Sequence, residues 1–252
     1  MDMNTIIGVV IGLGGIIIGN FIEGGHFSSL IQGTAAIIVL GGTLGATLVS
    51  NRAVHVKLAI QYLKLAFSPE EPSRLQSIAK DIVSAAAEAR KESVLAVDSK
   101  IKSFKSDYMK NVFRFVADGV EADKIKEVFL NDIEIEEERK LKAAKVWADA
   151  GGYAPTIGIL GAVLGLIHVM GNLTNTEELG KGIAVAFVAT IYGVGLANLI
   201  FLPISNKIKR KIEQESEEKF MIVDGALSII NGFSPYLIEE KMRSYTREAS
   251  NV

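Results

Sequence analysis

The chain has 252 residues, of which 49% are hydrophobic and 22% are charged, and it carries a formal net charge of −2 at pH 7. Its mean hydropathy is positive, so the composition indicates long apolar segments joined to a sizeable polar region. The weakly negative charge argues against nucleic acid as a partner, and the absence of cysteine excludes disulfides, thiolate metal sites and cysteine nucleophiles.

Two uncharged runs near the N-terminus are long enough to cross a bilayer. Met3–Ile22 and Phe27–Ser50 contain no Asp, Glu, Lys or Arg, and about 20 helical residues span a hydrocarbon core of about 30 Å. Gly8 and Gly12 share one helix face, which another helix can approach closely. The N-terminus has no basic segment and no small-residue cleavage site, so the first run is expected to be a retained helix rather than a signal peptide.

Residues 51–150 are rich in charged side chains and are predicted to form a helical insertion between the second and third spans. Pro72 is typical of a helix start. Arg90 and Asp98 flank a turn, Glu92–Val97, and from composition alone they are ordinary surface charges. The apolar residues of this insertion recur at helical spacing: Ile78, Ile82, Val112, Phe115, Val116, Ile125, Val128 and Phe129.

A second hairpin of uncharged runs, Tyr153–Met170 and Ile183–Leu202, is joined by the polar loop Gly171–Gly182. Each run is predicted to be a spanning helix, because backbone polar groups in hydrocarbon must be paired within the segment. Few polar atoms occur in these runs. One is the Thr190 hydroxyl, which either lines a polar path or bonds to the Ala186 carbonyl, the commoner case in helices.

Pro155 and Pro203 lie at the ends of these two runs. Proline is favoured in a first helical turn, which accounts for Pro155 without any function. Pro203 frees the Leu199 carbonyl and can bend a helix, although a plain helix terminus explains it equally well.

Basic residues predict the orientation of the four spans. Arg52, Lys57 and Lys64 follow the second run, and Lys207, Lys209, Arg210 and Lys211 follow the fourth, whereas the short loops are nearly free of Lys and Arg. The sequence therefore predicts an all-α integral membrane protein with cytoplasmic termini. Its predicted parts are two transmembrane helices in residues 1–50, a cytoplasmic helical domain in residues 51–150, two further transmembrane helices in residues 151–206, and a cytoplasmic C-terminal helical tail in residues 207–252.

None of the four spans contains Asp, Glu, Lys or Arg, and the chain carries no nucleophile, metal-ligand or nucleotide-binding motif. An enzyme is therefore not expected, nor is a cofactor or a metal site. A protein that moves ions through a membrane normally needs an ionisable group at depth. If this chain lines an ion path, a partner has to supply the carboxylate.

The second hairpin carries four specific motifs: Ala154-Pro155-Thr156-Ile157-Gly158, Gly161-Ala162-Val163-Leu164-Gly165, Ala189-Thr190-Ile191-Tyr192-Gly193 and Phe201-Leu202-Pro203. With them the chain resembles the flagellar motor stator subunits, the MotA branch of the MotA/TolQ/ExbB proton channel family, over nearly its whole length. The resemblance implies a homopentamer around two copies of MotB in the lipid of the bacterial inner membrane. MotB supplies the aspartate that this chain lacks, and ion passage turns the pentamer against the rotor protein FliG.

The same resemblance implies roles for individual residues. Thr190 matches the hydroxyl near the MotB aspartate, and Pro155 and Pro203 match the two prolines that couple the ion path to movement. Ala162 stands where sodium-driven relatives carry a threonine, which suggests protons as the coupling ion. Arg90 and Asp98 match the charged pair that meets FliG, with aspartate where the family often has glutamate, and Asp132 matches a further acid.

Two other interpretations remain open. ExbB/TolQ-type energising subunits of envelope transport complexes also pair with an aspartate-bearing helix, but they typically have three spans. A self-sufficient transporter or channel would be expected to show charges or broken helices inside the spans.

Overall fold

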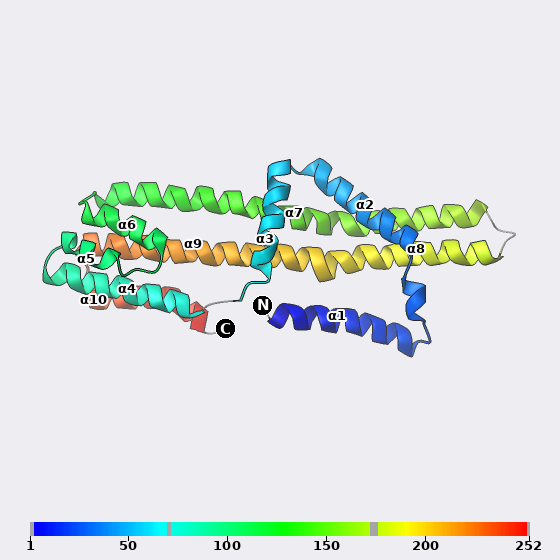
Figure 1. Ribbon diagram of the computed structural model, residues 1–252, viewed down its shortest axis with the longest axis horizontal. Coiled ribbons are helices and arrows are strands. Elements are labelled where there is room, and N and C mark those ends of the chain that lie inside the picture. Colours follow the sequence, from blue (N-terminus) through cyan, green and yellow to red (C-terminus); the bar gives the residue numbers. More distant parts are fainter. Residues whose placement is uncertain (1–2, 70–71, 172–175, 251–252) are drawn as a thin grey trace. The chain divides into compact units, whose positions relative to one another are not determined.

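The computed structural model describes residues 3–69, 72–171 and 176–250, and every regular element in these ranges is a helix (Figure 1). Contacts divide the chain into two compact units, Met1–Pro69 with Lys140–Lys211, and Glu70–Arg139 with Ile212–Val252. Two long helices, α7 (Ala122–Gly171) and α9 (Leu202–Ile230), contribute residues to both units.

Four helical segments among the described residues are long and apolar enough to cross a membrane, which confirms the predicted number. α1 (Met3–Ile22) coincides with the first predicted run. The second run is divided into a 3₁₀ helix, η1 (Phe27–Leu30), and α2 (Gly33–Ser50). The second hairpin consists of the later part of α7 and α8 (Thr176–Leu196), and residues 172–175 of its predicted loop lie outside the described residues.

α7 and α8 pack at backbone distance because their facing positions are glycine. A Cβ atom on Gly193 would lie 2.5 Å from the Ala154 carbonyl oxygen, and one on Gly158 would lie 2.9 Å from the Ala189 carbonyl oxygen. Such small-residue contacts are the usual way in which helices associate in hydrocarbon.

A short helix that the sequence analysis did not predict, α3 (Ala53–Ala66), follows α2. The Trp147 indole of α7 donates a hydrogen bond of 3.1 Å to the Ala59 carbonyl oxygen. Ala143 and Val146 of α7 form a small buried cluster with Ala59. Residues 51–69, which were expected in the inserted domain, therefore pack within the unit that holds the spans.

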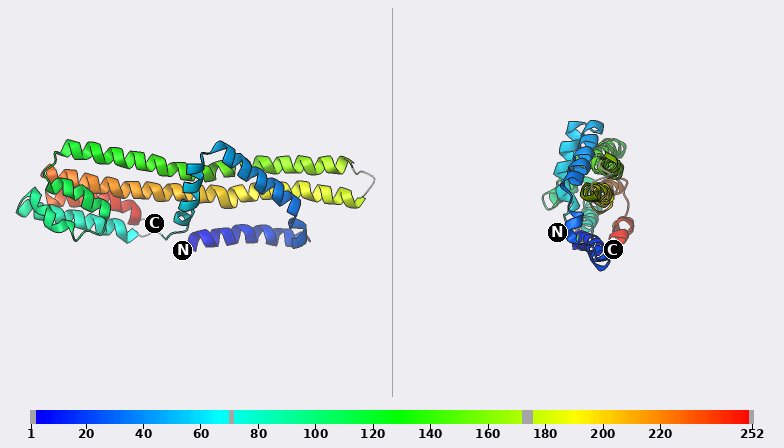
Figure 2. Two further views of the ribbon diagram at one scale, coloured as in Figure 1. Left: turned by 45° about the horizontal axis from the view of Figure 1, so that its top comes forward. Right: turned by 90° about the vertical axis from the view of Figure 1, so that its right-hand side faces the viewer.

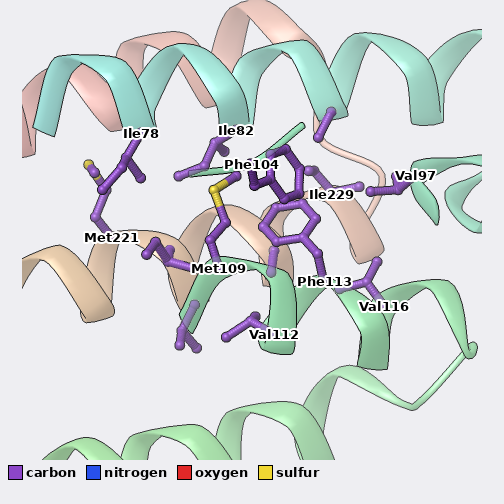
Figure 3. Close-up of a cluster of buried hydrophobic side chains, with 14 of the residues drawn as sticks. Ile78, Ile82, Val97, Phe104, Met109, Val112, Phe113, Val116, Met221 and Ile229 are labelled. Atoms are coloured by element: carbon purple, nitrogen blue, oxygen red, sulfur yellow. The ribbon is translucent and has the colours of Figure 1, made fainter. Parts of the chain in front are cut away.

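The second unit is a helical domain around one large apolar core. It contains α4 (Pro72–Lys91), the 3₁₀ helix η2 (Val94–Val97), α5 (Asp98–Ile101), α6 (Asp107–Ala117), the first part of α7, most of α9, and α10 (Pro235–Ser250). Figure 3 shows Ile82 of α4 directed toward Met109 of α6, and Ile78 of α4 beside Met221 of α9. The Phe113 ring meets Phe104 edge to face, with centroids 5.1 Å apart.

Helix caps and ion pairs position the helices of this unit. The Ser106 hydroxyl accepts a hydrogen bond from the Met109 amide and caps α6, as is usual for serine at a helix start. Gly232 has φ of +74°, a left-handed conformation that ends α9 and that residues with a side chain rarely adopt. The Arg74 guanidinium contacts both carboxylate oxygens of Glu218, at 2.8 and 2.9 Å, and joins α4 to α9.

The predicted apolar positions of this domain fall in the core with one exception. Val128 was expected to be buried beside Phe129, but 52% of its surface is exposed. On a helix, neighbouring residues point about 100° apart, so Phe129 and Val128 face different sides.

The close approach of α7 and α8 leads to a stability prediction. Gly193→Ala should push the helices apart, and overpacking of this kind typically costs about 1–3 kcal/mol. The melting temperature of the purified protein in detergent measures the loss.

The matched control is Gly180→Ala on the same helix, where a Cβ atom meets nothing within 4 Å. That change should be neutral or slightly stabilising, because alanine favours a helix over glycine by about 1 kcal/mol. Equal melting temperatures for the two variants would contradict the proposed tight contact.

Candidate functional site

Thr190 lies on α8, half-buried, and its hydroxyl donates a hydrogen bond of 3.3 Å to the Ala186 carbonyl oxygen. The bond to its own helix, one of the two alternatives from the sequence, is therefore present. It uses the hydroxyl hydrogen and leaves the oxygen lone pairs available as acceptors. The side chain can therefore still accept a hydrogen bond from a neighbouring group.

Ala162 lies on α7 at the same depth as Thr190. A Cβ atom on the preceding Gly161 would come within 2.8 Å of the Ala189 Cβ atom, and Ala189 directly precedes Thr190. Ala162 is half-buried and adds no polar atom. The structure thus places Ala162 and Thr190 next to the contacting pair Gly161 and Ala189, at one level of the hairpin, and of the two only Thr190 carries a hydroxyl.

Pro155 lies deep inside α7, not in a first helical turn, so the simple explanation from the sequence is wrong. A proline inside a helix removes the N–H that would pair with the carbonyl four residues earlier, here that of Gly151. Gly151 packs closely against α9, because a Cβ atom there would lie 2.7 Å from the Leu202 side chain.

Pro203 is the second residue of α9 and directly follows a π-helical segment, η3 (Ala197–Phe201). The helix does not end at Pro203, so the plain-terminus alternative is also wrong. The carbonyl freed by Pro203 belongs to Leu199, inside η3. π-helical segments are rare and occur frequently at functional sites.

The two prolines act on neighbouring parts of the hairpin. The carbonyl freed by Pro155 belongs to Gly151, and Gly151 contacts Leu202, the residue before Pro203. One turn of interrupted hydrogen bonding in α7 therefore packs beside a second one at the start of α9.

Tyr192 was given no role by the sequence analysis, yet it connects α8 to the chain between η1 and α2. Its hydroxyl donates a hydrogen bond of 2.6 Å to the Leu30 carbonyl oxygen and accepts one of 3.2 Å from the Gln32 amide. Gln32 is the N-cap residue of α2, so this bond occupies an amide close to the start of the helix. A tyrosine in an uncharged run is a usable signal, because a buried phenol needs a polar partner.

Arg90 and Asp98 lie on either side of η2 in the second unit. Arg90 is in the last turn of α4, Asp98 is the first residue of α5, and both are exposed. None of the ion pairs found among the described residues includes either of them. A contact of 3.8 Å between Lys100 and Glu88 joins α5 to α4 across the same turn.

Asp132 is exposed on α7 and borders a groove of about 340 Å³ between α6 and α7, with Val128 and Ile135 on the same rim. Tyr108 lies nearby. Burial raises the pKa of the Tyr108 phenol, and the charges of Asp132 and Glu136 act in the same direction. The phenol therefore stays neutral and protonated at physiological pH.

Comparison with known proteins gives consistent matches over nearly the whole chain. The model of the MotA/TolQ/ExbB proton channel family matches residues 99–221, and the model described as "Motility protein A N-terminal" matches residues 6–92. Motility protein A of Helicobacter pylori (strain ATCC 700392 / 26695) is 34% identical over 97% of this chain and 95% of its own length. Motility protein A of Bacillus subtilis (strain 168) is 31% identical over 97% of this chain and 91% of its own length.

A solved structure of MotAB from C. jejuni superposes with a TM-score of 0.90 at 29% identity, covering 97% of this chain and 96% of the solved one. The hairpin motifs, the four apolar helical segments and these matches all indicate the same family. The chain belongs to the MotA/TolQ/ExbB proton channel family.

Proposed function

We propose that this chain is a stator subunit of the bacterial flagellar motor, which together with MotB conducts ions and converts the ion-motive force into torque on the rotor protein FliG. The observation that carries the proposal is the match to a MotAB structure along nearly the whole chain. An ExbB/TolQ-type role fits less well, because the N-terminal motility model also matches and the chain has four candidate spans.

The chemistry of the spans supports an ion path that is completed by a partner. The uncharged parts of the four helical segments contain no carboxylate, so MotB brings the group that binds and releases the ion. Thr190 accepts a hydrogen bond from that protonated carboxyl or from a water beside it. With alanine at position 162, the layer has too few oxygen ligands to replace the water of a sodium ion, which favours protons.

Pro155 and Pro203 are the proposed coupling points. Each leaves a helix carbonyl without its backbone partner, so α7 and η3 can bend at these positions with fewer hydrogen bonds to break. Because Gly151 and Leu202 are in contact, bending of one helix shifts the other. A change of charge at the ion site is in this way converted into movement of the helices that lead to the second unit.

The second unit is proposed to lie in the cytoplasm, with both termini, and to meet FliG through Arg90 and Asp98. The basic residues that follow the second and fourth runs support this orientation in the inner membrane. Arg90 and Asp98 are exposed charges of opposite sign on one turn, so they can pair with complementary charges on a rotor helix. Asp132 extends this contact along α7. The assembly is proposed to be a homopentamer around MotB.

The first test concerns the Thr190 hydroxyl. Thr190→Val keeps the shape but removes the acceptor, and it should abolish swimming while the complex still assembles in the membrane. Thr190→Ser should retain much of the swimming speed. Thr34→Val, the same change at an exposed position on α2, is the matched control and should swim normally. A motile Thr190→Val strain would refute the site.

The second test concerns the coupling ion. Swimming speed should be insensitive to replacement of external sodium by potassium and should fall when an uncoupler collapses the proton gradient. Speed that follows the sodium concentration would refute the assignment based on Ala162.

The third test reverses the exposed charges. Arg90→Glu combined with Asp98→Lys should abolish motility without changing the amount of protein in the membrane, whereas single neutral substitutions should have small effects, because exposed pairs contribute under about 1 kcal/mol each.

The matched control reverses a pair on α10 that is satisfied within the chain, Arg243→Glu with Glu239→Arg, whose groups lie 2.9 Å apart. This variant should swim normally. Normal swimming of the Arg90 and Asp98 double reversal would return both residues to the class of ordinary surface charges.

A further inference from the structure

α3 is held across α7 just outside the apolar part of that helix. Its contacts with α7 fall at Ala143, Val146 and Trp147, whereas the uncharged run of α7 begins only after Asp149. The Asn51 side chain, in the turn before α3, donates a hydrogen bond of 3.0 Å to Asp149. Figures 1 and 2 both show α3 running transverse to the long axis of α7. If α7 crosses a bilayer, as the proposed function requires, α3 lies along the membrane surface.

One face of α3 stays exposed and combines basic with aliphatic side chains. We call it the α3 basic face and define it as Arg52, Val54, Lys57, Ile60 and Lys64. Val54, Lys57, Ile60 and Lys64 follow one another at intervals of three or four residues, so they share one side of the helix. Ile60 is 63% and Val54 is 54% exposed, which is a large apolar exposure for side chains in water.

Within the residues that the structure describes, no acidic side chain pairs with the charges of this face. α3 contains no Asp or Glu. None of the ion pairs found in the described parts of the chain includes Arg52, Lys57 or Lys64. By contrast, the exposed Arg243 of α10 contacts two acids, Glu239 at 2.9 Å and Glu240 at 2.6 Å. The basic side chains on α3 are therefore available to an external anion.

We propose that α3 is an interfacial helix whose basic face binds the headgroups of anionic phospholipids in the cytoplasmic leaflet. Helices that lie in a membrane surface place aliphatic side chains at the headgroup and acyl boundary and lysines against the phosphates. Long basic side chains reach the phosphate level while their stems stay in the apolar layer. Because Trp147 and Asn51 attach α3 to α7, headgroups held by α3 also set the depth of α7 in the bilayer.

The test is native mass spectrometry of the complete stator complex, including its partner, with added phosphatidylglycerol or phosphatidylcholine. The wild-type complex should retain phosphatidylglycerol in preference to phosphatidylcholine. Lys57→Gln combined with Lys64→Gln should lower the affinity for phosphatidylglycerol about fivefold for each lysine removed and leave phosphatidylcholine binding unchanged. The single variants repeat the test in two smaller steps if the double variant is unstable.

Two controls separate charge from structure. Lys57→Arg with Lys64→Arg keeps both charges and should keep the preference for phosphatidylglycerol. Lys102→Gln with Lys126→Gln removes two exposed charges from the second unit and should also keep it. Added salt should weaken the wild-type preference, because exposed charges are screened.

An unchanged phosphatidylglycerol affinity in the Lys57 and Lys64 glutamine variant would overturn the proposal. So would a variant that loses subunits while its lipid binding is intact, because the face would then contact a neighbouring copy of the chain. The outcome is independent of torque: a lost lipid preference alongside a motile Thr190→Val strain would keep the role of α3 and refute the proposed ion site.

Discussion

Hydrocarbon gives two apolar helices no hydrophobic reason to associate, so the α7–α8 hairpin depends on the van der Waals contact that its glycines allow. At Gly158 and Gly193 the facing backbones are so close that a methyl group would collide with a carbonyl oxygen. This contact holds Ala162 and Thr190 in one layer. It also leaves no room for a larger side chain at Gly158 or Gly193.

The same hairpin combines this rigid contact with two places where helical hydrogen bonding is interrupted. Pro155 lies inside α7, and η3 precedes Pro203 between α8 and α9. The carbonyl freed by Pro155 belongs to Gly151, and η3 follows Gly193, so both interruptions lie on the same side of the contact between Gly158 and Ala189. The hairpin thus has a tight layer at Gly158 and Ala189 and, beside Gly151, a layer with fewer helical hydrogen bonds, where the proposed bending would take place.

Length and charge in the sequence predicted the spans well, because a run without charges such as Met3–Ile22 has few alternatives to a membrane helix. The first-turn explanation of Pro155 was wrong, because a proline beside an apolar run looks like a helix start even when the helix continues on both sides. For Pro203 the sequence left a bend and a helix end open, and the structure excludes the helix end. α3 was missed because its stabilising partner, Trp147, lies far away in the chain. The sequence motifs led to Thr190 as a candidate site residue, which stays a prediction. The contacts of Tyr192 were not foreseen, because its partners are backbone groups that no residue pattern marks.

Tyr192 has a consequence for the order of biogenesis. Its two hydrogen bonds join residues that are 160 and 162 positions apart, so neither can form until α8 has been synthesised. α1 and α2 are therefore both present in the nascent chain before these bonds exist, and the N-terminal end of α2 acquires them only after α8 has been made. A nascent chain that stops before α8 would contain both early helices but not a finished loop between them.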